Sequence, residues 1–223
     1  MKRTFLAATV AALFLAGCSG DPSETSQREA TPIENTAAAP VADESAATDA
    51  ASVPAAAMDQ AALTAEAKQA VMALGSTLKT QLQAAIQSGG PASAVDVCHK
   101  IAPATAASLS EEHGLTLTRV SLRNRNPEMG VPNDWQTVVL QDFEARKAAG
   151  EGADRLAYSE VVDGEYRFMK AIPTEAVCLN CHGADIKPDV QAKIDALYPE
   201  DRAVGFSEGD LRGAFVAVRK LAE

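Results

Sequence analysis

Between residues 63 and 86, apolar side chains recur every three or four residues, which is the spacing that places them on one face of a helix. The positions that share this face are Leu63, Ala67, Ala70, Val71, Leu74, Leu78, Leu82 and Ile86. Ser88-Gly89-Gly90 ends the pattern, and the Pro91 that follows suits the first turn of another helix. The chain therefore predicts two consecutive helices, of which the first is long and amphipathic.

The apolar face of the second predicted helix includes a cysteine. Its members are Val95, Cys98, Ile101 and Ala102. Because these residues share one face, we expect Cys98 to point inward, whereas His99 lies about 100° further around the helix. Gly114 ends this segment.

Beyond Gly114 the apolar pattern changes to that of strands. We expect strands over residues 115–121, 156–162, 165–172 and 211–221. Asp163-Gly164 is a two-residue hairpin signal between the middle two. Two more helices are predicted, one that begins at Asn133 or Asp134 and ends at Gly150, and one over residues 188–198. Helices first and an antiparallel sheet of about four strands afterwards, with helices on one side, make an α+β fold.

The N-terminus has the pattern of a bacterial export signal. Lys2 and Arg3 precede an apolar stretch that ends at Phe14, which is too short for a stable membrane span. Leu15-Ala16-Gly17-Cys18 resembles a lipobox, which implies cleavage after residue 17 and lipidation of Cys18. An ordinary cleaved signal with a stray cysteine is the alternative. Several acyl chains make a durable anchor, so we expect the membrane as a partner, on its periplasmic face. Ser19 after the cysteine favours the outer membrane over the inner one.

Residues 18–57 are rich in Ala, Ser, Thr and Pro, acidic and poor in large apolar side chains. Such a segment cannot bury enough surface to order itself, so we interpret it as a linker. Residues 58–223 then form one domain of ordinary size. The whole chain carries a net charge of −10, and loss of Lys2 and Arg3 with the signal makes it more acidic. This charge argues against nucleic acid as a partner.

Cys178-Leu179-Asn180-Cys181-His182 reads C-x-x-C-H, the attachment signature of c-type haem. In that chemistry two thiols bond to the porphyrin, and the adjacent histidine supplies its imidazole to the iron. A thioredoxin-like redox pair and half of a zinc site are the alternatives. The first would open a helix in a strand–helix–strand unit, and the second would need another pair of ligands. Because the chain has no second C-x-x-C and carries an export signal, we favour one covalent haem c.

The remaining cysteine bears on the sixth iron ligand. With Cys18 assigned to lipid and the C-x-x-C pair to haem, Cys98 is left over. Free surface thiols are oxidised in the compartment of an exported protein, so we expect Cys98 to be buried, paired between chains or bound. If His182 is the proximal ligand, the sixth ligand comes from Cys98, His99, His113, Met129, Met169, another donor or none.

Three arginines lie in or just after the predicted strand over residues 115–121. Arg119, Arg123 and Arg125 are candidates for pairing with the haem propionates, and the alternative is that they are solvated charges in ordinary salt bridges. Trp135 is expected to pack in the core near the haem.

The chain resembles a known family in several further short motifs. They are Val97-Cys98, Ala102-Pro103, Arg119 to Pro127, Pro132 to Trp135, Ile172-Pro173, Cys178 to Gly183, Tyr198 to Phe206 and Gly209 to Gly213. Together they resemble the PAS-like single-haem c domain, also called the Tll-like haem domain. The resemblance implies a PAS-like antiparallel sheet, haem in a helix-rimmed pocket, and a low-potential iron ligated by His182 and by Cys98.

Members of this family occur as sensor inputs of membrane kinases and as stand-alone exported proteins. The resemblance therefore implies a monohaem cytochrome that acts as a redox or gas sensor, or as a one-electron carrier, with a redox or signalling protein as partner. The lipobox adds the expectation of a membrane anchor. The alternative is a haem enzyme, such as a peroxidase or a small-oxide reductase. An enzyme needs an open iron site, and a thiolate on the sixth position argues against one, so we expect no catalytic residues.

Overall fold

The computed structural model describes the backbone of residues 55–221 and the side chains of residues 60–221. The predicted signal peptide 1–17, Cys18 and the predicted linker up to residue 54 lie outside the described residues. Among the described residues, no helix combines the length and the apolar character that crossing a membrane requires.

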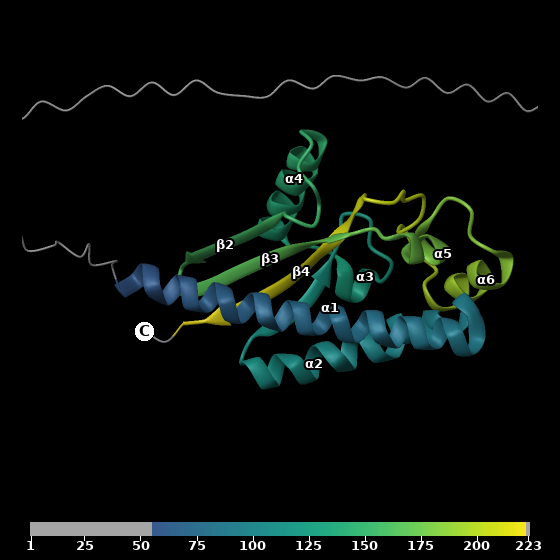
Figure 1. Cartoon of the computed structure of the whole chain (residues 1–223), viewed down its shortest axis with the longest axis horizontal. Helices are drawn as coiled ribbons and strands as arrows, with labels where there is room; N and C mark the ends of the chain where they lie inside the picture. The colour runs from purple at the N-terminus through teal and green to yellow at the C-terminus, as the bar shows by residue number, and fades with distance from the viewer. Residues whose placement is uncertain (1–54, 222–223) are drawn as a thin grey trace, which may run out of the picture. The chain divides into compact units, whose positions relative to one another are not determined.

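The elements follow one another as helices, strands and short helical turns (Figure 1). The helices are α1 (Ala55–Asp96), α2 (Ala102–His113), α3 (Pro127–Gly130), α4 (Asp134–Ala148), α5 (Leu179–His182) and α6 (Pro188–Leu197). A π-helical turn, η1 (Val97–Ile101), joins α1 to α2, and a 3-10 turn, η2 (Ala176–Cys178), precedes α5. The strands are β1 (Thr116–Val120), β2 (Ala157–Val162), β3 (Glu165–Pro173) and β4 (Leu211–Lys220).

The four strands form one antiparallel sheet in the order β1-β4-β3-β2. The predicted hairpin is confirmed, since β2 and β3 pair directly across Asp163 and Gly164. Both turn residues have positive φ, 52° and 69°, as a two-residue hairpin of this kind requires. The α+β fold with N-terminal helices is therefore confirmed.

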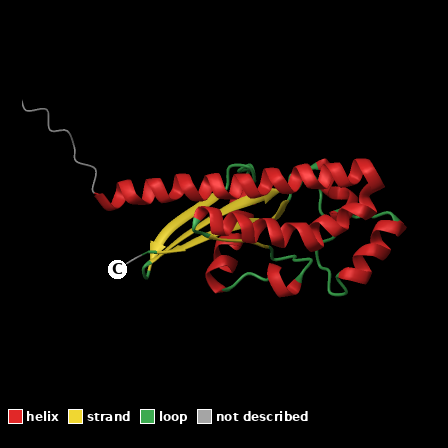
Figure 2. Cartoon of the chain, turned by 90° about the horizontal axis from the view of Figure 1, so that it is seen from below, coloured by secondary structure: helices red, strands yellow, loops and turns green. Residues whose placement is uncertain are grey.

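Helices cover both faces of the sheet, so the expectation of helices on one side is wrong. On one face, α1 and α2 pack against Leu117, Tyr166, Phe168 and Ala217. On the other face, α4 packs against Met169, Ala214, Val216 and Leu211. Figure 2 shows α1 running along the sheet on its side of the molecule. The run Ala214 to Val218 in β4 is apolar without interruption, which is the pattern of a strand buried on both faces.

The predicted boundary between the first two helices is confirmed, because Gly90 breaks the helical path with φ 74° and ψ 178°. The expectation that Ile101 faces inward with Cys98 is wrong, since Ile101 is 38% exposed. The π-helical turn explains this difference. It adds a residue to one turn and thereby shifts the helix faces that follow.

Candidate functional site

One large cavity of about 290 Å³ lies between the helices and the end of the sheet. Its wall is mostly apolar, with contributions from α1, the sheet and the segment before α5. Representative lining residues are Leu78, Leu82, Ile86, Leu117, Ile172 and Phe215. A cavity of this size and lining suits a mainly apolar small-molecule ligand.

The C-x-x-C-H residues all line this cavity. Cys178 ends η2, and Cys181 and His182 lie on α5, so the spacing of three and four residues puts all three on one side of a helical turn. Gly183 follows because a side-chain carbon there would collide with the Leu179 carbonyl oxygen, 2.7 Å away. The sequence analysis did not predict this short helix, which has only four residues.

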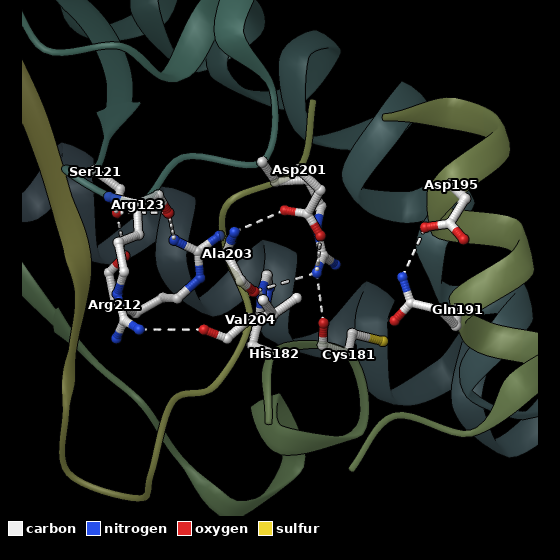
Figure 3. A network of polar contacts seen from close by, with 11 residues as sticks. Ser121, Arg123, Cys181, His182, Gln191, Asp195, Asp201, Ala203, Val204 and Arg212 are labelled. Carbon is white, nitrogen blue, oxygen red and sulfur yellow. Dashed lines mark hydrogen bonds and ion pairs between the residues drawn. The ribbon is translucent and has the colours of Figure 1, made fainter. Parts of the chain in front are cut away.

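The geometry prepares His182 to act as a metal ligand through Nε2. Its Nδ1 lies 2.7 Å from the carbonyl oxygen of Ala203 (Figure 3). Because a carbonyl only accepts, Nδ1 carries the proton and the lone pair of Nε2 is free. Burial, together with the positive charges of Arg212 and Arg125, holds the pKa of His182 well below its usual range. The imidazole is therefore neutral, as a metal ligand must be.

The cavity also collects three thiols. Burial raises the pKa of Cys178 and of Cys181, so both are neutral thiols in the protein alone. Cys98 reaches the same cavity from η1, eighty residues earlier in the chain. The structure thus confirms that Cys98 faces the interior and brings it to the wall that holds the C-x-x-C-H residues.

Arg125 ties the C-x-x-C-H helix to the loop that holds His182. Its Nη2 donates to the carbonyl oxygens of Cys181 and Ala203, and lies 3.0 Å from Asp201 Oδ2. The Arg125 and Asp201 side chains are each only 7% exposed. Asp201 in turn accepts a hydrogen bond from the backbone nitrogen of Ala203, 2.8 Å away. We name this set, Arg125, Asp201, Cys181 and Ala203, the arginine brace.

Removal of one partner of this ion pair should be costly. Arg125→Met leaves the Asp201 carboxylate buried and unpaired, so we expect the free energy of unfolding to fall by about 3–5 kcal/mol. Chemical denaturation measures the change. Arg125→Met combined with Asp201→Asn should recover part of it, because the buried charge is then gone. Arg146→Met is the control, since the Arg146–Glu151 pair is about one-third exposed and should contribute less than about 1 kcal/mol. Equal losses for Arg125→Met and Arg146→Met would contradict the brace.

Of the other two predicted arginines, one lines the cavity and one lies outside it. Arg119 lines the cavity and has no hydrogen bond or ion pair within residues 60–221. Arg123 does not reach the cavity wall. Its guanidinium lies 3.6 Å from the centroid of the Phe206 ring and donates to the Val204 carbonyl.

Arg212 is a cavity residue that the sequence analysis missed. It precedes Gly213, where a side-chain carbon would collide with the Val120 carbonyl oxygen, so the start of β4 lies directly against the end of β1. Burial lowers the pKa of Arg212 to about 10, and the charges of Arg125 and Arg119 add to this effect. A charged residue beside a glycine, directly before the apolar run Ala214 to Val218, was the available signal.

Of the other candidate iron ligands, only Met129 lines the cavity. His99 is half-buried and makes an edge contact with Tyr198, 5.5 Å between ring centroids, but does not line the cavity. His113 ends α2 away from the cavity, and Met169 is fully buried in the cluster under α4. Met129 lines the cavity at its exposed rim.

The expectation that Trp135 packs near the haem pocket is wrong. Its ring stacks on Tyr158, 6.2 Å between centroids, and it packs against the cluster under α4. It does not line the cavity. The α4 face of the sheet, which the sequence analysis missed, explains this position.

The alternative chemistries of the C-x-x-C pair find little support in this arrangement. Helix α5 lies between two antiparallel strands and is followed by another helix, α6, so it is not part of a thioredoxin-like strand–helix–strand unit. In the part of the chain that the structure describes, no three His, Cys, Asp or Glu side chains lie close enough to one another to hold a metal ion, although three thiols and His182 line the cavity.

Comparisons with known proteins agree with the fold. No curated protein matches the chain in sequence. Among solved structures, the crystal structure of the cyanobacterial heme-protein Tll0287 is similar, with a TM-score of 0.56 and 23% identity over 70% of this chain and 92% of that chain. The Tll0287-like family model matches residues 44–218, which is most of the sequence. The chain therefore belongs to the Tll0287-like family.

Proposed function

We propose that the protein is a monohaem c-type cytochrome, exported and lipid-anchored, that serves as a redox or gas sensor or as a one-electron carrier. The observation that carries this proposal is the convergence of Cys178, Cys181, His182 and Cys98 on one apolar cavity. The similar solved structure is that of a heme-protein, which supports the same cofactor here. We also propose that the sheet is PAS-like, in keeping with that resemblance.

The residues of the cavity fit a covalent haem. Cys178 and Cys181 are half-buried thiols free to form thioether bonds, and neither is held in a disulfide. His182 presents a neutral imidazole whose Nδ1 proton is already bonded to Ala203, which fixes the ring and leaves Nε2 for the iron. Cys98 is the sixth ligand in this proposal. When bound, the haem would supply an iron that changes between the ferric and ferrous states by one electron.

Two arginines are available for the two propionates. Arg125 is engaged in the arginine brace, and Arg123 lies over Phe206 outside the cavity. Arg119 and Arg212 line the cavity and form no ion pair within residues 60–221. Since three guanidinium groups face the cavity and Asp201 neutralises only one, two positive charges remain for two carboxylates. We therefore add Arg212 to Arg119 as a propionate partner.

A redox titration followed by absorbance tests this role. We expect one reversible, one-electron transition at low potential, with a low-spin ferric form, because a thiolate stabilises ferric iron. Carbon monoxide binding by the reduced protein would identify a gas sensor, and a reduced form that stays six-coordinate would identify a carrier. Rapid turnover of peroxide or of a small oxide would instead establish an enzyme and overturn the proposal.

The membrane anchor is a separate prediction. We expect the exported protein to partition with membranes on their periplasmic face, and Cys18→Ser to release it or to stall its processing, because the lipid attaches to this thiol. Fractionation followed by immunoblotting measures the distribution. Cys98→Ser is the matched control and should stay with the membrane. A wild-type protein that is soluble and cleaved at another position would contradict the lipidation of Cys18.

A further inference from the structure

Tyr198 is a buried aromatic residue that faces both the cavity and the segment carrying Cys98. It follows α6 directly, is 5% exposed, and packs with Val95 and Ile194. Its ring meets the His99 ring edge-on at an interplanar angle of 81°. His99 adjoins Cys98 in the chain, and both Tyr198 and Cys98 line the cavity, so the tyrosine lies on the side of the cavity that the turn η1 forms.

The Tyr198 hydroxyl has no protein hydrogen-bond partner within residues 60–221, and its oxygen is not fully enclosed by protein, so it is open to an added partner. The hydroxyl of a largely buried tyrosine usually has a partner, and since Tyr198 lines the cavity, a group inside the cavity is the natural one. A tyrosine phenol keeps its proton at neutral pH and therefore acts as a donor toward an anion.

We propose that the Tyr198 hydroxyl donates a hydrogen bond to the Cys98 sulfur when that sulfur is bound to the haem iron as a thiolate. This inference rests on the proposed function, and it makes Tyr198 a positioning residue that adjusts the iron through its ligand. A thiolate that accepts a hydrogen bond gives less electron density to the iron. Ferric iron is then stabilised less, so the hydrogen bond raises the reduction potential.

Tyr198→Phe removes the hydroxyl and keeps the ring against His99. We expect the variant to retain covalent haem, to change its ferric absorption and electron paramagnetic resonance spectra, and to become harder to reduce. A charge-assisted hydrogen bond supports about a tenfold change in the reduction equilibrium, or about 59 mV toward negative potential for one electron.

Tyr166→Phe is the matched control, because it also deletes a buried tyrosine hydroxyl. That hydroxyl donates to Thr64 Oγ1 at 3.0 Å, and Tyr166 does not line the cavity. We expect wild-type spectra and potential from it. In a Cys98→Ala background, Tyr198→Phe should no longer move the potential, since the acceptor is gone.

The wild-type protein provides a test that does not depend on how the variants fold. Exchange into heavy water should shift the iron–sulfur stretching frequency in the resonance Raman spectrum, because the proton on the hydrogen bond is exchanged. An absent shift, or a Tyr198→Phe potential equal to that of wild type, would overturn the inference. Absence of covalent haem from the wild-type protein would instead overturn the proposed function, and a haem stain distinguishes the two cases.

Discussion

Cys178→Ser combined with Cys181→Ser should abolish covalent haem attachment. Each thioether bond needs one of these thiols, and both line the cavity beside His182. We expect the exported double variant to give no band on a haem-stained denaturing gel, against a strong band for the wild type. Each single variant should retain one possible bond and stain more weakly.

Cys98→Ser is the control for that experiment. It deletes the third thiol of the same cavity, which takes no part in the covalent bonds, so its haem band should match that of the wild type. Equal staining of the double variant and the wild type would show that the haem, if present, is attached elsewhere.

Cys98→Ala should convert the ferric iron from low spin to high spin or to ligation by solvent, and raise the reduction potential. The reason is the loss of a strong anionic donor that stabilises ferric iron. We expect a rise on the order of 100 mV within the range of about 0.8 V that axial ligands span. Absorption spectra and a redox titration measure both effects.

The same variant bears on the sensor hypothesis. If the protein is a sensor, one electron from a donor such as dithionite would reduce the bound iron, and Cys98 would take a proton from solvent and leave as a neutral thiol. Carbon monoxide should then bind only the reduced protein. His99→Ala should leave the ferric spectrum unchanged, because His99 does not line the cavity. A ferric spectrum that responds to His99→Ala or Met129→Ala but not to Cys98→Ala would rule out the thiolate ligand.

Apolar periodicity sufficed for the long helices and for the inward position of Cys98, and the Asp163-Gly164 turn signal sufficed for the hairpin, since each depends on neighbours in sequence. The helices α3 and α5, of four residues each, are too short to show a period. Periodicity failed where one turn departs from the regular period. The π-helical turn at Val97–Ile101 exposes Ile101. The spacing of apolar residues does not show that this helical turn contains one extra residue. The second face of the sheet could have been predicted, because the unbroken apolar run from Ala214 to Val218 indicates a strand covered on both sides.

The C-x-x-C-H residues were identifiable because their chemistry needs a fixed local spacing. Their supporting contacts were not, because they join distant segments. Arg125 binds the backbone carbonyls of Cys181 and Ala203. Every residue has such a carbonyl, so the sequence does not show which ones an arginine will bind. Arg212 comes to the cavity only because β4 pairs with β1 across a close glycine contact. Contacts of this kind, between distant segments, can be identified only once the order of the strands in the sheet is known.

The most direct measurement of the central claim is the intact mass of the exported wild-type protein, followed by mapping of the peptide that contains Cys178 to His182. The account predicts a mass increase of one haem, located on that peptide through Cys178 and Cys181. A full-length exported protein in which both thiols carry no haem would contradict it.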